Sequence, residues 1–142
     1  FSLAAKWLAR SQWLPRALAS PSLRWRATGS MLADTGSSID PIMSRCYDTL
    51  LSDPDHIAGT LRMMASWDLP PLLSRLSELQ QTIWLAACEG DRTIPPSRST
   101  SAARYLTHCR TLLIPKLGHL GHEESPATFA NLLQALIVSI QS

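Results

Sequence analysis

Two short polar loops hold the residues best suited to chemistry in this 142-residue sequence. Residues 88–96 read CEGDRTIPP and residues 118–124 read GHLGHEE, and each loop follows an apolar run. The first loop offers the carboxylate of Asp91 and the second the imidazole of His119. A carboxylate bound to one ring nitrogen fixes the tautomer of a histidine, so that the other nitrogen can serve a nucleophile as general base. Asp91 and His119 are therefore the candidate catalytic residues.

The elements around these loops predict that the two side chains meet. Residues 82–88 form a continuous apolar run, which is typical of a strand covered on both faces in a parallel sheet. Residues 97–106 predict a helix, and residues 110–115 predict a second buried strand. Strands joined by a helical crossover run parallel, and functional groups gather at the carboxyl ends of such strands. We therefore expect Asp91 and His119 to lie within reach of each other.

Alternatives exist for both residues. Asp91 could serve only as a helix cap or as the partner of Arg92. His122 also follows a glycine and is a second candidate for the base, although the spacing to Glu124 favours His119. The remaining two histidines, near the start of a helix and just before a strand, are expected to be structural or exposed.

The sequence lacks a recognisable nucleophile. Hydrolase triads run serine, acid, histidine along the chain, with the serine in a G-x-S-x-G turn. No such motif occurs, because the Gly-Ser pairs at 29–30 and 36–37 lack the second glycine and a preceding apolar strand. Without the nucleophile and the oxyanion hole beside it, acyl transfer has no route. We therefore expect this chain alone to be catalytically inactive.

The first half of the sequence predicts short helices broken by proline and glycine, with no convincing strand. One helix is expected at about 39–51, and Asp53-Pro54 predicts an N-cap with proline at the first helical position of the next. That next helix places three apolar residues on one stripe: Ile57, Leu61 and Met64. A closing helix after Ser125-Pro126 carries a longer stripe: Phe129, Leu132, Leu133, Leu136, Ile137 and Ile140. Because two strands cannot satisfy a sheet, more strands must come from elsewhere, and a bare sheet should make this chain poorly soluble or oligomeric.

Composition limits the class of protein. Hydrophobic residues make up 45% and charged residues 17%, which is typical of a globular protein, and a net charge of +2 is too small to indicate nucleic-acid binding. No run of eighteen apolar residues exists, which excludes a membrane span. The first 33 residues are basic and free of acid, which fits a transit peptide, a membrane-surface helix, or a cap helix with solvated cations. The cysteines Cys46, Cys88 and Cys109 match no metal or disulfide spacing, so we expect no metal, no cofactor and a reducing compartment.

Several strings resemble known proteins. The G-D-R-x-I-P pattern at residues 90–95 is similar to the acid loop of α/β-hydrolases, and residues 118–126 are similar to their histidine loop. Residues 35–40 (TGSSID) and 56–69 (HIAGTLRMMASWDL) resemble one branch of that superfamily more closely. That branch is the magnesium chelatase accessory protein family, linked to bacteriochlorophyll synthesis in phototrophic bacteria.

The resemblance implies an α/β fold, namely the C-terminal part of an α/β-hydrolase. Residues 1–75 would form its helical cap, and residues 76–142 would form a part of the core with two parallel strands and flanking helices. Asp91 would be the triad acid and His119 the base. A flat pigment could slide between three cap residues, although their spacing fits core packing as well: Met63, Met64 and Trp67.

The resemblance leaves two functional hypotheses open. In the first, the intact protein is a serine-hydrolase-type enzyme acting on a small ester or a related substrate. In the second, it is a non-catalytic helper that binds a porphyrin-type ligand or magnesium chelatase, and Asp91 and His119 are inherited rather than used. Either protein would be cytoplasmic, with peripheral membrane contact through the basic N-terminal segment as a further option.

Overall fold

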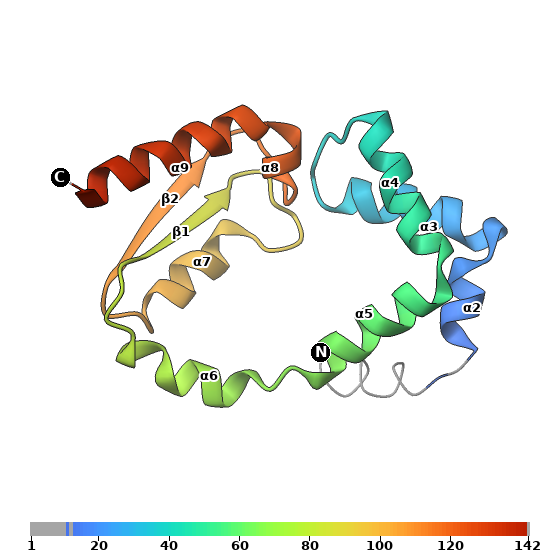
Figure 1. The fold of residues 1–142 in the computed structure, drawn as a ribbon, viewed down its shortest axis with the longest axis horizontal. Helices are drawn as coiled ribbons and strands as arrows, with labels where there is room; N and C mark the ends of the chain where they lie inside the picture. The colour runs from blue at the N-terminus through green and yellow to red at the C-terminus, as the bar shows by residue number, and fades with distance from the viewer. Residues whose placement is uncertain (1–10, 12, 142) are drawn as a thin grey trace. The chain divides into compact units, whose positions relative to one another are not determined.

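The computed structural model describes residue 11 and residues 13–141, and within these it leaves the side chains of residues 25, 140 and 141 undescribed. The chain divides into two compact units. One comprises Phe1–Leu32 and Pro41–Leu79, and the other comprises Ala33–Asp40 and Gln80–Ser142. Figure 1 shows that the first unit is helical and that the second contains the sheet. Part of the basic, acid-free N-terminal segment, residues 1–10 and 12, lies outside the described residues, and so do the predictions for it.

Each helix of the first unit has a proline at its first or second position. They are α2 (Leu14–Ala19), α3 (Pro21–Asp34), α4 (Pro41–Ser52), α5 (Pro54–Ser66) and α6 (Leu69–Arg75), followed by a 3-10 turn, Leu76–Glu78. Proline suits the first turn of a helix because its fixed φ is helical and its missing N–H has no partner there in any case. The last residues of α3 pass into the second unit. Gly29 does not interrupt α3, contrary to the expectation that glycine breaks these helices.

Helix α5 follows its sequence pattern closely. The Asp53 side chain accepts a hydrogen bond from the N–H of Asp55 at 2.8 Å, which confirms the predicted N-cap. Ile57 is buried, and Leu61 and Met64 are half-buried, so the predicted stripe faces the interior of the unit. Met63 and Trp67, by contrast, are 53% and 52% exposed. Core packing therefore accounts for Met64 but not for Met63 and Trp67.

One cation of the basic segment has a specific partner. Arg24 Nε lies 3.0 Å from Asp48 Oδ1, and this ion pair joins α3 to α4. Arg24 is thus not simply solvated, as the cap-helix interpretation assumed. No helix within residues 13–141 is both long and apolar enough to cross a membrane.

The second unit is built on a parallel pair of strands, as predicted. Its elements are β1 (Ile83–Cys88), α7 (Pro96–Ala103), β2 (Cys109–Ile114), α8 (Gly121–Glu124) and α9 (Pro126–Gln141). The strands pair from Ile83 opposite Cys109 to Cys88 opposite Ile114. Helix α7 packs against both strands, and both arrows in Figure 1 point toward α8. The chain is therefore of mixed α/β class with two adjacent parallel strands.

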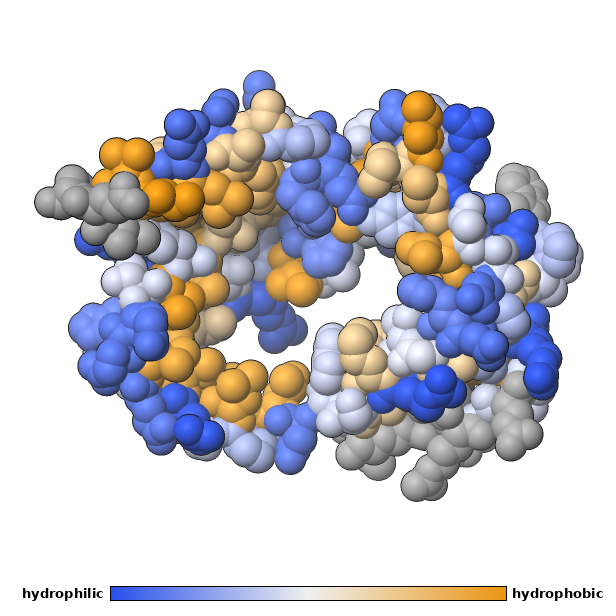
Figure 2. All heavy atoms as spheres, in the orientation of Figure 1, coloured by the Kyte–Doolittle hydropathy of each residue, from blue (hydrophilic) through white to orange (hydrophobic). Residues whose placement is uncertain are grey.

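The prediction of a buried strand at residues 110–115 is wrong for the described residues of β2. Side chains alternate between the two faces of a strand, so Thr111 and Leu113 share one face. Both are exposed, while Ile114 on the other face is buried. The stripe of α9 is also only partly covered, because Leu133 and Ile137 are 59% and 56% exposed. Apolar surface along α9 is visible in Figure 2. The sequence pattern correctly indicated apolar positions, but the burial of a strand also depends on neighbours that the pattern does not contain.

Candidate functional site

The acid loop directly follows β1 and is folded by its own carboxylate. Asp91 Oδ1 accepts hydrogen bonds from the backbone N–H groups of Thr93 at 2.9 Å and Ile94 at 2.7 Å. The side chain thus caps the turn that leads toward α7, as aspartate does in Asx turns. Arg92 forms no ion pair among the described residues, so that alternative for Asp91 finds no support in the structure.

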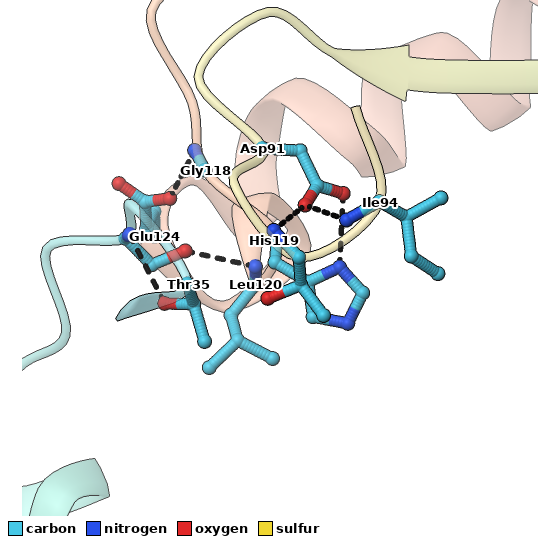
Figure 3. Close-up of polar contacts among 9 residues, drawn as sticks. Thr35, Asp91, Ile94, Gly118, His119, Leu120 and Glu124 are labelled. Atoms are coloured by element: carbon cyan, nitrogen blue, oxygen red, sulfur yellow. Dashed lines mark hydrogen bonds and ion pairs between the residues drawn. The ribbon is translucent and has the colours of Figure 1, made fainter. Parts of the chain in front are cut away.

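The second carboxylate oxygen of Asp91 faces His119. Asp91 Oδ2 lies 2.9 Å from Nδ1 of His119, as Figure 3 shows. The side chain of Asp91 is 12% exposed and that of His119 is 31% exposed. An ionised carboxylate can only accept, so a neutral His119 must carry its proton on Nδ1. The ring's Nε2 points away from Asp91 in Figure 3 and has no hydrogen-bond partner among the described residues, so it is free to act as a base.

The structure brings Asp91 together with His119 and not with His122. His122 Nε2 lies 3.6 Å from the carboxylate of Glu123, and its ring meets Phe129 edge-on with centroids 6.1 Å apart. His56 and His108 are exposed. Neither the alternative base His122 nor the other two histidines form a hydrogen bond or ion pair with Asp91 among the described residues.

A third segment, which the sequence did not place at the site, joins the two loops. The carbonyl oxygen of Thr35 accepts the N–H of His119 at 3.1 Å and the N–H of Arg92 at 3.3 Å. Thr35 is only 7% exposed. The next residue, Gly36, has φ +76°, and a Cβ at that position would contact the carbonyl oxygen of Gly90. Only glycine meets both demands easily, because it tolerates positive φ and has no Cβ.

Glu124 ties this turn to the histidine loop. Its Oε1 accepts the N–H of Gly118 at 2.7 Å and its Oε2 accepts the N–H of Ser38 at 3.0 Å. Burial alone would raise the pKa of the Glu124 carboxyl, but these two bonds and one from the Ser37 hydroxyl lower it below its ordinary value. In the sequence, the position of Glu124 five residues after His119 is the one local signal of this role.

A cavity of about 280 Å³ opens beside the Asp91–His119 pair. Its lining includes Asp91, His119, Cys88, His122 and Phe129. Its volume lies just below the range of about 300–1,000 Å³ that small-molecule sites occupy. Burial raises the pKa of the Cys88 thiol, and the nearby charges of Asp91 and Glu124 raise it further. Cys88 is therefore held as a thiol and is poorly suited to act as the nucleophile.

Nothing in the described part of the chain forms a metal centre. No three side chains of the types that bind metal ions (His, Cys, Asp or Glu) gather there. The Asp91–His119 contact offers the chemistry of an oriented acid–base pair: a carboxylate, an imidazole bound to it through Nδ1, and an Nε2 that faces away from the carboxylate.

No protein-family model matches the sequence. The Magnesium-chelatase 30 kDa subunit of Rhodobacter capsulatus is 42% identical to it over 95 residues, which make up 67% of this chain and 33% of that protein. The similarity supports that family. The chain spans about a third of the length of the chelatase subunit that it matches. The similarity agrees with the family to which the sequence strings pointed, whereas it carries no information about a hydrolase fold.

Proposed function

We propose that this chain is the acid- and base-bearing part of an α/β-hydrolase-type accessory protein that supports magnesium chelatase in bacteriochlorophyll synthesis. The similarity to the chelatase subunit supports the pathway. Residues 1–75 would act as the helical cap, except for the segment Ala33–Asp40 that belongs to the second unit, and residues 76–142 would act as part of the core. Mixed α/β structure with adjacent parallel strands is compatible with that core.

The observation that carries the proposal is the hydrogen bond of 2.9 Å between Asp91 and His119. The two residues follow adjacent parallel strands, so both project at the carboxyl edge of the sheet, where α/β enzymes place their chemistry. In this arrangement Asp91 would stabilise the imidazolium that forms when Nε2 takes a proton from a nucleophile. The reaction class that such a pair serves is acyl transfer from a small ester or a related substrate to a nucleophile, with the alcohol of the ester as leaving group.

The nucleophile is not supplied by a G-x-S-x-G motif of this sequence. The proposal therefore assigns catalysis to the complete protein, and the 142-residue chain alone should not turn over an ester.

A second candidate function requires no nucleophile. In it, the protein binds a porphyrin-type ligand or the chelatase without chemistry, and the Asp91–His119 pair serves only to shape the loops. The relative's name gives an assembly with chelatase and no reaction of its own, which this candidate explains directly.

A complementation experiment separates the two candidates. The gene for the complete protein to which the proposal assigns catalysis, with this chain as part of it, would be introduced into a Rhodobacter capsulatus strain that lacks its 30 kDa subunit, and bacteriochlorophyll would be measured by absorbance. The catalytic proposal expects pigment to return with the unaltered gene and with His122→Gln, but not with Asp91→Asn or His119→Gln.

Pigment with all four genes would overturn the catalytic proposal and leave the binding function. No pigment with any of them, despite normal protein levels on a blot, would overturn the link to chelatase itself.

A further inference from the structure

Three consecutive backbone amides around His119 donate to the same small cluster of acceptors. The N–H of Gly118 is bound by Glu124 at 2.7 Å, and the N–H of His119 by the Thr35 carbonyl at 3.1 Å. The N–H of Leu120 is bound by the Ser37 hydroxyl oxygen at 2.8 Å. The residue before the histidine, the histidine and the residue after it are thus all held by hydrogen bonds, as Figure 3 shows in part.

Ser37, Glu124 and the backbone amides that they bind form one connected hydrogen-bond network, which we call the tie. Ser37 accepts from Leu120 and donates its own proton to Glu124, while Glu124 also accepts from Ser38. The tie links segments that are 83 and 86 residues apart in the sequence. Gly118 is needed for it, because a Cβ there would lie 2.5 Å from both the backbone nitrogen and the Oγ of Ser37.

We infer that Glu124 and Ser37 are positioning residues that hold the His119 ring against Asp91. Once three successive amides are fixed, only the side-chain torsions of His119 remain to be set, and Asp91 sets them by accepting from Nδ1. The inference rests on the proposed function only where it treats His119 as a base. The positioning itself can be measured on the ring without any reaction.

The tie requires a carboxylate rather than any polar group. Three donors converge on Glu124: the N–H of Gly118, the N–H of Ser38 and the hydroxyl of Ser37. A carboxylate has two accepting oxygens and no proton to donate, so it can satisfy all three. A glutamine has one accepting oxygen, and its NH₂ group would face at least one of the donors.

The test follows the tautomer of His119 by nitrogen NMR in the ¹⁵N-histidine-labelled 142-residue chain, at a pH well above the ordinary histidine pKa of about 6.5. The exposed His56 and His108 provide the tautomer ratio of an unheld ring in the same sample. The variants are Glu124→Gln and Ser37→Ala. The matched control is Glu123→Gln, which makes the same change of charge in the same helix, at a carboxylate that lies against His122.

In the unaltered chain we expect His119 to be almost wholly in the Nδ1–H form. In Glu124→Gln its ratio should move toward that of His56, and the amides of Gly118 and Leu120 should exchange with solvent at least about tenfold faster, which corresponds to ~1.4 kcal/mol. Ser37→Ala should shift the tautomer in the same direction by less. Glu123→Gln should leave the ring and both amides unchanged.

Other outcomes discriminate clearly. An unchanged tautomer in a folded Glu124→Gln chain, or an equal shift in Glu123→Gln, would overturn the positioning role. If Glu124→Gln does not fold, as judged by circular dichroism, Ser37→Ala decides alone, and an unchanged ring there overturns the inference. A ring that is not enriched in the Nδ1–H form in the unaltered chain would instead remove the basis of the proposed function.

Discussion

Glycine-to-alanine substitution at position 118 tests directly whether the 35–38 turn lies against the histidine loop. A Cβ at Gly118 would lie 2.5 Å from two atoms of Ser37 and would also contact the carbonyl carbon of Gly36. These are mostly backbone atoms, so the turn must move as a whole. Such overpacking costs about 1–3 kcal/mol, and displacement of Ser37 would add about 0.5–1.5 kcal/mol for its bond to Leu120. Gly118→Ala should therefore lower the free energy of unfolding of the second unit by about 2–4 kcal/mol.

The matched control is the same substitution at Gly59, in the interior of α5. A Cβ there would meet no atom within 4 Å. Alanine is favoured over glycine inside a helix by roughly 0.8–1 kcal/mol, so Gly59→Ala should stabilise the first unit. The two substitutions add the same methyl group, and the structure predicts opposite signs for them. Composition or propensity alone would predict no such reversal.

Hydrogen exchange at increasing urea concentration, followed by mass spectrometry, measures each unit separately. Peptides from β1 and β2 report the second unit, and peptides from α5 report the first. If Gly118→Ala leaves the exchange of the β1 and β2 peptides unchanged and the Leu120 amide still protected, then the turn does not lie against the histidine loop. The description of the site would then be wrong.

Three further predictions concern single side chains of the site. Because the pKa of Glu124 is lowered in the folded state, its charge should stabilise the chain above the ordinary glutamate pKa of about 4.3, and this contribution should be lost as the pH falls through the lower folded pKa. The difference in unfolding free energy between the unaltered chain and Glu124→Gln, measured by urea titration, should therefore shrink in acid. A difference that does not change with pH would contradict this. Cys88 is buried with a raised pKa, so iodoacetamide should alkylate it at least tenfold more slowly than the exposed Cys46 near neutral pH, as peptide mass spectrometry would show; equal rates would refute its burial. Asp91→Asn should reverse the tautomer of His119 in the NMR experiment above while the fold is kept, and an unchanged tautomer would show that the ring does not depend on Asp91.

The sequence predicted those parts of the molecule that depend on local signals. Proline at the first helical position marked the starts of α5 and α9, and the Asp53 cap was visible from residue type alone. The order of strand, acid, helix, strand and histidine predicted that Asp91 and His119 follow adjacent strands. Parallel pairing at the carboxyl edge is a general property of such sheets, so the distance between the two residues needed no further information.

The parts that the sequence did not predict depend on contacts between distant segments. The turn at 35–38 looks like an ordinary Gly-Ser turn, and nothing within ten residues of it indicates a histidine loop more than 80 residues away. Its hydrogen bonds to the loops use mainly backbone groups, and every residue type has these, so the sequence does not indicate their partners. The exposure of Leu113 in β2 is a similar case. An apolar residue in a strand indicates a position that can be buried, but it does not indicate whether this chain contains the residues that would cover it.

The two oxygens of Asp91 explain why one substitution can separate catalysis from architecture. Oδ1 holds the acid loop through hydrogen bonds from Thr93 and Ile94, which makes Asp91 the cap of a turn and not of α7, whose N-cap is Pro95. This role leaves Oδ2 unexplained, and Oδ2 is the atom that faces His119. An asparagine can keep its carbonyl oxygen at the first position, while its NH₂ group takes the second and donates to Nδ1. The loop then stays folded, but the ring must carry its proton on Nε2 and has no lone pair there for a base. A cap alone would survive this exchange unchanged, whereas an acid–base pair would lose its function with its structure intact.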